Sequence, residues 1–402
     1  MNKKILFVIN TLGQAGAEKS LIEYIKQLHK YQYDIDLFVI IPRGEMFLQI
    51  PDYVHILNKK YSSQSVLNHF GQLAIIKQVI YAFFYHFHGF RMLPYLWKCL
   101  LSQKGHIRYD KLFWKLLAKS CSRFDTTYDL AIAYIEGAST YYVSEFVKSK
   151  HKISFIHIDY QVAGYNRVID EDCYENIEMI YGVSKNVCQS FLNVYPEYKD
   201  KIKIFRNIID VSSIKELSLK GSGFQDDFQG TRILTVGRLH YQKGYDIAID
   251  VLDRLCKDGY SIKCYVLGDG PQRKELEQLI KDKHLENHFI LLGTTSNPYP
   301  YYKHCDLYVH ASRFEGKSIA IEEAQVLKKV VIASNCSGTE EQIQNGYDGI
   351  IVELKCQEIV DAIKKVIDHP EYKQELEKNI ALKDWNYQSE IDEIKSYLEK
   401  MG

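Results

Sequence analysis

Short, almost continuously apolar runs recur along the chain and alternate with longer stretches in which apolar residues return with helical spacing. The runs predict strands buried on both faces of a parallel sheet, and the longer stretches predict amphipathic helices. The expected strands are 4–9, 36–41, 130–134, 152–157, 179–183 and 203–206, followed by 232–236, 261–267, 288–292, 307–310, 330–333 and 349–352. This alternation predicts an α/β fold with parallel sheets and right-handed crossovers.

The order of these runs also predicts the domain organisation. At 402 residues the chain is long enough for two domains, on a prior of roughly 150 residues each. Residues 207–231 are rich in glycine, aspartate and glutamine, and we expect the interdomain linker there. The predicted domains are residues 1–208 and 209–384, each Rossmann-like, and residues 385–402 have the pattern of a final helix.

Composition favours a cytosolic protein without nucleic-acid or metal chemistry. A hydrophobic content of 46% allows full cores, and a formal net charge of zero gives no overall attraction to nucleic acid. The nine cysteines are scattered and form no Cys-x-x-Cys pair, which indicates reduced thiols. The apolar run Ile5–Ile9 is too short for a signal peptide, and no run approaches the ~20 residues that span a bilayer. No cluster has metal-ligand spacing.

The segment 312–324 places two glutamates eight positions apart across a predicted loop and helix start. Gly316 allows a sharp turn, and Ser318 is suited to cap the helix. The backbone amides of Ser318 and Ile319 are expected to face a phosphate, because a helix start offers free N–H groups. Glu323 is expected to accept hydrogen bonds from an attached ribose, with Glu315 just before the helix. A solvated helix start with unrelated acids is the alternative interpretation.

Two further glycine turns follow predicted strands in the same half of the chain. Gly237 ends an apolar strand and is followed by Arg238 and Lys243, and Gly268 ends the next strand. Ligands of open α/β sheets bind at the carboxyl ends of the strands. A planar guanidinium beside an ammonium suits a diphosphate leaving group. Three such turns, one βα unit apart, make a stronger signal than any one of them.

Together these motifs resemble the retaining glycosyltransferases of family 4, also called glycosyl transferases group 1, of the type that builds bacterial cell-surface polysaccharides. The residues that carry the resemblance are 237–239, 243–244, 268–271 and 315–324, with weaker support from 7–20. Lys317 and Ser318 depart from it, because an apolar residue and a proline often follow Glu-Gly in the family. Asn207 begins a stretch that lacks the usual proline. The resemblance implies the two-domain GT-B fold and a final helix that packs back on the first domain.

The resemblance also implies roles for single residues. Arg238 and Lys243 would hold the diphosphate and replace a divalent ion, so no metal or other cofactor is expected. Glu315 would hold hydroxyls of the donor sugar rather than attack as a nucleophile. His157, at the tip of a predicted strand, would bind the donor sugar, although a satisfied core histidine is the alternative.

In the first domain the glycines of a predicted loop, Gly13 and Gly16, would let the backbone approach donor and acceptor. Glu18 then begins a helix and is expected to be a dipole partner. Glu136 ends another predicted strand and is a candidate for contact with the acceptor.

Residues 59–123 are a basic, aromatic segment that matches nothing general in the family. Eleven lysines and arginines stand against the single acid Asp110, a net charge of +10 in an otherwise acidic chain. Mixed aromatic and basic residues favour an interfacial helix pair on an anionic membrane. Lys111, Lys115 and Lys119 are four apart, so we expect them on one exposed face. Ordinary core helices, and less so single-stranded nucleic acid, are the alternatives.

The sequence therefore predicts a glycosyltransferase that moves a hexose or N-acetylhexosamine, from a UDP-sugar in the first instance, to a glycan or lipid-linked acceptor. Capsule or lipopolysaccharide synthesis is the expected setting, on the cytoplasmic face of the membrane. Two alternatives remain at this stage. One is a nucleotide-sugar epimerase or hydrolase on the same scaffold, and the other is a catalytically silent sugar-nucleotide-binding partner.

Overall fold

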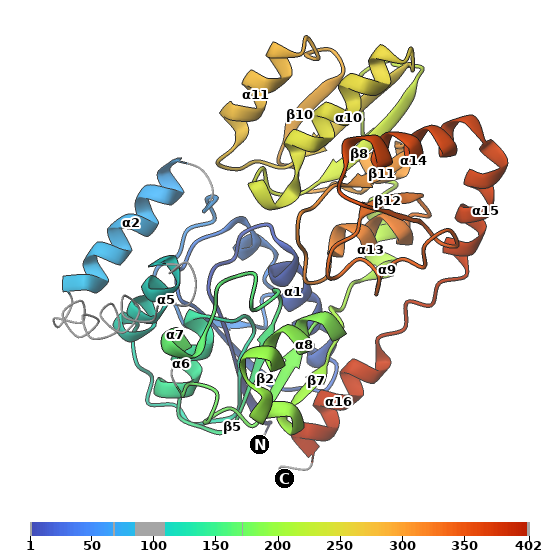
Figure 1. Ribbon diagram of the computed structural model, residues 1–402. Helices are drawn as coiled ribbons and strands as arrows, with labels where there is room; N and C mark the ends of the chain where they lie inside the picture. The colour runs from blue at the N-terminus through green and yellow to red at the C-terminus, as the bar shows by residue number, and fades with distance from the viewer. Residues whose placement is uncertain (1, 67–68, 85–108, 171, 400–402) are drawn as a thin grey trace. The chain divides into compact units, whose positions relative to one another are not determined.

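The computed structural model describes residues 2–66, 69–84, 109–170 and 172–399 (Figure 1). The chain divides into two compact units. Unit 1 comprises Met1–Ile208 together with Tyr387–Gly402, and unit 2 comprises Ile209–Asn386. Each unit is built on one parallel sheet with helices on both faces, which confirms the predicted α/β class.

The sheet of unit 1 has the strand order β3-β2-β1-β4-β5-β6-β7. Its strands are parallel and comprise β1 (Lys4–Ile9), β2 (Asp34–Val39), β3 (His55–Ile56), β4 (Tyr128–Ala133), β5 (Ser149–Ile156), β6 (Met179–Gly182) and β7 (Ile202–Ile204). The central strand β1 is fully buried from Ile5 to Ile9, because helices cover it on both sides. The short strand β3 was not predicted.

Helices cover the two faces of this sheet with different residues. On one face Phe7 packs against Tyr24 of α1 (Gly16–His29), and Tyr181 donates to Glu393 of α16 (Gln388–Glu399). On the other face Leu6 and Val8 join a core cluster that the remaining helices complete. These are α2 (His69–Phe84), α5 (Tyr109–Ser120), α6 (Ala138–Phe146), α7 (Arg167–Asp170) and α8 (Lys185–Val194). Among its described residues the unit also has 3-10 turns at Glu45–Gln49 and Pro196–Lys201.

The sheet of unit 2 has the order β10-β9-β8-β11-β12-β13, again parallel. Its strands are β8 (Thr231–Val236), β9 (Ile262–Leu267), β10 (Phe289–Gly293), β11 (Leu307–His310), β12 (Val331–Ser334) and β13 (Ile350–Val352). Two core clusters lie on opposite faces of this sheet. The helices are α9 (Val211–Leu217), α10 (Tyr245–Lys257), α11 (Arg273–Asp282), α12 (Tyr299–His304), α13 (Ile319–Val326), α14 (Cys356–Asp368) and α15 (Pro370–Ala381).

The stretch predicted as a linker is only partly irregular. Residues 211–217 form α9, and Asp210 caps it by accepting a hydrogen bond from the Ser213 amide at 2.9 Å. Helix α9 contacts α12 and α13, so this part of the stretch belongs to unit 2. The glycine and aspartate content of this stretch favoured a linker, whereas Asp210 and Ser213 have the spacing of a helix N-cap.

The prediction of an exposed lysine face on α5 is wrong, because two of its three residues are buried and the third, Lys119, is only partly exposed. Lys111 and Lys115 are buried, with exposed fractions of 9% and 1%. The Lys111 ammonium lies 4.5 Å from the ring centre of Tyr165, and Lys115 Nζ donates to the Ile169 carbonyl at 3.3 Å. Spacing of four does put these lysines on one face, but aromatic rings and carbonyl oxygens inside the unit accept their ammonium groups.

Much of the basic aromatic segment lies outside the described residues. These include five of its aromatic residues and four of its basic residues, namely Tyr85, Phe87, Phe90, Tyr95, Trp97, Arg91, Lys98, Lys104 and Arg108. Within the segment the structure describes α2 and α5, which pack against each other. Among the helices of the described ranges, none has the length and apolarity needed to cross a bilayer.

Candidate functional site

The motifs of unit 2 meet at the carboxyl ends of β8, β9 and β11. Gly268 has φ +154°, and a Cβ there would lie 1.9 Å from the carbonyl oxygen of Gly237. Gly244 has φ +62°, and its Cβ would lie 2.1 Å from the Ala311 carbonyl oxygen. Only glycine allows these close approaches. The loops that carry Arg238, Lys243 and Glu315 are therefore packed backbone to backbone.

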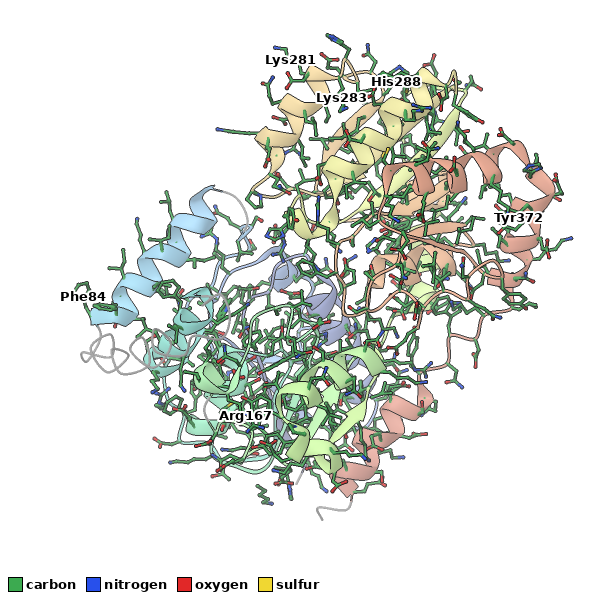
Figure 2. All side chains as sticks on the ribbon, viewed as in Figure 1. Phe84, Arg167, Lys281, Lys283, His288 and Tyr372 are labelled. Carbon is green, nitrogen blue, oxygen red and sulfur yellow. The ribbon has the colours of Figure 1, made fainter. Side chains whose placement is uncertain are left out.

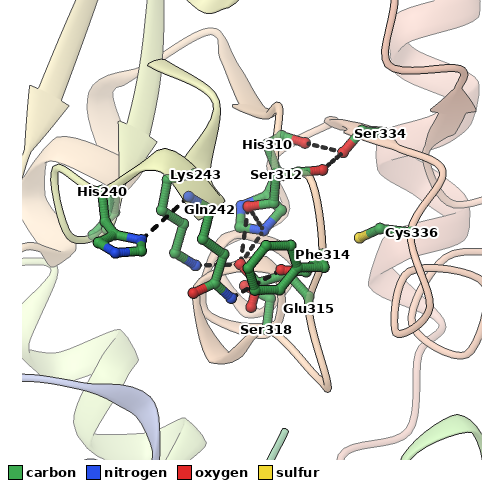
Figure 3. A network of polar contacts seen from close by, with 12 residues as sticks. His240, Gln242, Lys243, His310, Ser312, Phe314, Glu315, Ser318, Ser334 and Cys336 are labelled. Atoms are coloured by element: carbon green, nitrogen blue, oxygen red, sulfur yellow. Dashed lines mark hydrogen bonds and ion pairs between the residues drawn. The ribbon is translucent and has the colours of Figure 1, made fainter. Parts of the chain in front are cut away.

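Glu315 is the centre of a buried polar network at this edge (Figure 3). Its Oε1 forms an ion pair with Lys243 Nζ and accepts from Ser312 Oγ at 2.9 Å and His310 Nε2 at 3.3 Å. Burial alone would raise the pKa of the Glu315 carboxyl, but the Lys243 ammonium and the His310 contact outweigh it and hold that pKa well below its usual range. Glu315 is therefore a fixed carboxylate anion.

His310 supports this carboxylate from the last position of β11. It is 2% exposed, and burial lowers the pKa of its imidazole, so the ring is neutral near pH 7. Because a carboxylate only accepts, Nε2 carries the proton, and Nδ1 accepts from the Tyr308 hydroxyl at 3.3 Å. Sequence patterns did not single out His310 or Ser312, although the spacing His-x-Ser-x-x-Glu was visible.

The two cations of this edge differ in their surroundings. Lys243 is held by Glu315, whereas Arg238 is exposed, and its guanidinium has no hydrogen bond or ion pair within the described ranges. Arg238 is thus available to an anionic ligand as it stands. Lys243 is available only if a ligand shares it with Glu315. The two residues were predicted as an equivalent pair, and the structure distinguishes them.

The start of α13 differs from prediction in one respect. Ser318 is at the N-cap position, but its side chain forms no capping hydrogen bond. Its backbone N–H, expected to face a phosphate, donates instead to Gln342 Oε1 at 2.8 Å. The first helical residue, Ile319, follows directly, and the N–H groups of a first helical turn have no intrahelical acceptor.

Glu323 lies inside α13 and is 2% exposed. Its two carboxylate oxygens accept from the hydroxyls of Tyr299 and Tyr302 at 3.2 and 3.1 Å. These tyrosines belong to α12 and were not predicted as part of the site. Their order in the sequence gives no sign that they approach Glu323, since that contact depends on how α12 and α13 pack.

The remaining candidates lie in unit 1 and are described there by themselves. Gly13 precedes α1, with Val66 Cγ2 3.2 Å from the place of its Cβ, and Gly16 is the first residue of that helix. His157 follows β5. Burial lowers the pKa of its imidazole to about 4, against a smaller opposing effect of the Tyr134 carbonyl. Its Nε2 is buried without a hydrogen-bond partner among the residues described.

Three residues that follow neighbouring strands of unit 1 are tied together. Glu136, after β4, accepts from the His157 backbone N–H at 2.9 Å. Asn10, after β1, donates to the Glu136 carbonyl at 3.0 Å and accepts from the Ser139 N–H at 2.9 Å. The edge of this sheet is therefore ordered, with a buried carboxylate and a neutral imidazole. Asn10 was not predicted.

Among the residues that the structure describes, no group of three or more His, Cys, Asp or Glu residues is placed to hold a metal ion.

The match to a known protein family lies within unit 2. Residues 226–383 match the family model described as glycosyl transferases group 1. The chain is 32% identical over 190 residues to the N-acetylgalactosamine-N,N'-diacetylbacillosaminyl-diphospho-undecaprenol 4-alpha-N-acetylgalactosaminyltransferase of Campylobacter jejuni, covering 47% of this chain and 50% of that protein. It is 30% identical over 186 residues to the amylovoran biosynthesis glycosyltransferase AmsD of Erwinia amylovora, covering 45% and 51%.

The chain therefore spans about half the length of these curated relatives. Among solved structures, HepE of Anabaena in complex with UDP and glucose superposes with a TM-score of 0.70 and 18% identity, over 99% of this chain and 100% of that one. At this identity the likeness bears on the fold alone. It confirms the predicted GT-B fold.

Proposed function

We propose that this chain is a retaining group 1 glycosyltransferase, which moves a hexose or N-acetylhexosamine from a nucleotide-diphosphate sugar to a glycan or lipid-linked acceptor. The observation that carries the proposal is the polar edge of unit 2, within the region that matches the family model. There an anionic Glu315 is paired with Lys243, and Arg238 is exposed without a partner in the described ranges. Opposite charges at the ends of parallel strands suit a polar sugar joined to an anionic diphosphate.

Each residue of this edge has a chemical task in the proposal. Arg238 and Lys243 stabilise the charge that develops on the departing diphosphate, with the Ile319 amide of α13 adding a helix-start dipole. Glu315 accepts from hydroxyls of the donor sugar. It is assigned no nucleophilic role, because Lys243, His310 and Ser312 all contact the same oxygen. No metal is required when two cations face the leaving group.

We assign Glu323 to the ribose hydroxyls, which would replace or share its tyrosine partners. In unit 1 we assign His157 to the donor sugar, because its buried, unpartnered Nε2 belongs to a neutral imidazole whose other nitrogen donates to the Tyr134 carbonyl, so Nε2 can accept a hydrogen bond from a sugar hydroxyl. Gly13 and Gly16 are assigned to the approach of backbone to ligand, and Glu136 to the acceptor.

The donor and acceptor are proposed by analogy. UDP is the proposed nucleotide because HepE of Anabaena was solved with UDP and glucose. A lipid-linked or polysaccharide acceptor is proposed because one relative is named for a diphospho-undecaprenol substrate and another for amylovoran biosynthesis. Capsule or lipopolysaccharide synthesis is therefore the proposed setting.

Nucleotide release tests this function. Wild-type protein is incubated with a panel of UDP-sugars, with and without lipid-linked acceptors, and UDP is measured. A transferase releases UDP slowly alone and faster with the right acceptor. A hydrolase would release it at the same rate with or without acceptor, an epimerase would convert the sugar without release, and a silent binding partner would do neither.

We further propose that the protein associates with the cytoplasmic face of the membrane through residues 59–123. Helix α2 supports this. Its inner residues pack on the core cluster, while its outer face carries Leu73, Ile76, Ile80 and Phe84 with exposed fractions of 40, 53, 52 and 67%. Figure 2 shows the Phe84 side chain at the outer end of α2. An exposed apolar stripe in a basic segment suits an anionic bilayer.

Vesicle flotation tests this association. The triple variant Leu73→Ser/Ile76→Ser/Ile80→Ser is expected to lose binding to vesicles of phosphatidylglycerol, while its turnover on a soluble acceptor is kept. The matched control is Leu48→Ser, which removes an apolar side chain that is 80% exposed elsewhere in unit 1. Equal flotation of wild type and triple variant would contradict the membrane proposal.

A further inference from the structure

The segment Ser337–Gln342, here called the clamp segment, contacts the loop 315–318 at three points. Ser337 Oγ donates to the Glu315 carbonyl at 2.7 Å. Gly338 lies so close to Gly316 that a Cβ at position 338 would be 2.3 Å from the Gly316 carbonyl oxygen. Gln342 then reaches Ser318. The clamp segment therefore contacts the loop 315–318 from Glu315, the centre of the polar network, to the start of α13.

The contact of Gln342 is a two-way hydrogen bond to one backbone unit. Gln342 Oε1 accepts from the Ser318 N–H at 2.8 Å, and Gln342 Nε2 donates to the Ser318 carbonyl at 2.8 Å. Both residues are 4% exposed. A buried N–H without an acceptor lowers stability by its full desolvation free energy. The Ser318 N–H is buried at the start of α13, and Gln342 Oε1 is its acceptor.

Gln342 is itself held in place. Its carbonyl accepts from Gln325 Nε2 at 3.2 Å and from Lys383 Nζ. Lys383 Nζ also contacts Gln325 Oε1 and Asp348 Oδ2, each at 3.0 Å. These contacts fix the backbone of Gln342, and the two hydrogen bonds to Ser318 fix its side-chain amide, so Ser318 is held in one orientation.

We infer that Gln342 is a positioning residue of the donor site, an inference that rests on the proposed function. It acts through Ser318 and touches no substrate itself. By taking the Ser318 N–H it fixes the first turn of α13, and it leaves the Ile319 amide as the helix-start N–H that meets the diphosphate. It also holds the loop that presents Glu315.

The hydrogen bonds between Ser318 and Gln342 can be tested by removing the donor and the acceptor separately and together. A proline at position 318 would carry no N–H. Serine brings a buried donor to that place, and Gln342 supplies the acceptor. Removing donor and acceptor together is therefore expected to cost far less than removing the acceptor alone.

UDP affinity is measured by calorimetry, and the donor KM and kcat are measured in parallel, for three variants. Gln342→Met keeps the length of the side chain, loses both hydrogen bonds, and is expected to weaken UDP binding and raise the donor KM by about tenfold. The double variant Ser318→Pro/Gln342→Met is expected to recover binding to within about threefold of wild type. Gln344→Met, at an exposed position two residues on, is the control and is expected to behave as wild type.

The outcomes separate the inference from the function it rests on. Wild-type UDP affinity in Gln342→Met, or a double variant no better than the single one, overturns the inference alone. Absence of UDP binding by the wild type overturns the proposed donor and this inference with it. If Gln342→Met does not fold, Gln342→Glu takes its place. Its carboxylate still accepts from the Ser318 N–H but no longer donates to the Ser318 carbonyl, so UDP binding is expected to be weaker than wild type by less than about tenfold, and unchanged affinity refutes the role.

Discussion

The pairing of Glu315 with Lys243 leads to an unusual prediction, that removing a buried charge of the candidate site tightens nucleotide binding. Glu315→Gln keeps the size of the side chain and one acceptor oxygen but removes the negative charge beside the proposed diphosphate subsite. Lys243 is then released from its ion pair. The bare nucleotide diphosphate gains an unshared cation and loses a repulsive neighbour, so UDP is expected to bind more tightly.

The magnitude follows from the burial of the pair. The side chains of Lys243 and Glu315 are 18% and 10% exposed, so screening by water is incomplete. A unit charge about 7 Å from a phosphate contributes roughly 2 kcal/mol at an effective dielectric of about 20. Allowing for partial exposure, we expect about 1–2 kcal/mol, or roughly five- to thirtyfold tighter UDP binding. Turnover falls by about 10²-fold, because the sugar loses its charged acceptor.

Calorimetry with UDP at low salt measures the affinity, and donor turnover is measured in parallel. Glu340→Gln, which neutralises an exposed acid of unit 2, is the matched control. Because the pKa of Glu315 is held well below its usual range, the wild-type carboxylate stays charged between pH 5 and 8, and all three proteins are compared at one pH in this range so that the charge of UDP is the same. Unchanged or weaker UDP binding in Glu315→Gln, with Glu340→Gln at the wild-type value, would refute the reasoning.

Three further predictions concern charge and burial. Arg238→Ala is expected to lower turnover by about 10²-fold or more, and near-normal kcat would remove Arg238 from the leaving-group subsite. Burial raises the pKa of Asp170 from 3.8 to about 6, so its contribution to stability is present below pH 4 and lost as pH rises through 6. Denaturation across this range should show Asp170→Asn without that loss, a difference of about 3 kcal/mol, and parallel curves would contradict it. Lys115→Ala is expected to lower the free energy of unfolding by roughly 1–3 kcal/mol, against less than about 0.5 for Lys119→Ala; equal effects would mean that burial of Lys115 is unimportant.

Most of the fold was predictable because parallel strands buried on both faces read as apolar runs. The predicted strand 307–310 coincides with β11, and 4–9 coincides with β1. The short β3 escaped because two residues carry no periodicity. The lysines of α5 were misplaced because charge suggests exposure, while the ring of Tyr165 and the carbonyl of Ile169 are brought to α5 only by tertiary packing.

The candidate site was predictable where its residues are close in sequence. The spacing of Glu315, Gly316 and Ser318 indicated the site. Gln342, in contrast, lies 24 residues from the backbone group that it holds. His310 looked like the last residue of a buried strand, and its contact with Glu315 depends on how the loop turns back. Hydrogen bonds made across a fold leave little trace in a single sequence.

The most direct test of the central claim is UDP release from a panel of UDP-sugars in the presence of membrane lipid extract, compared between wild type, Arg238→Ala and Lys243→Ala. We expect the wild type to release UDP from at least one sugar, faster with extract than without. Each variant should lose this activity by about 10²-fold. No release from any UDP-sugar, or equal release by all three proteins, would contradict the account.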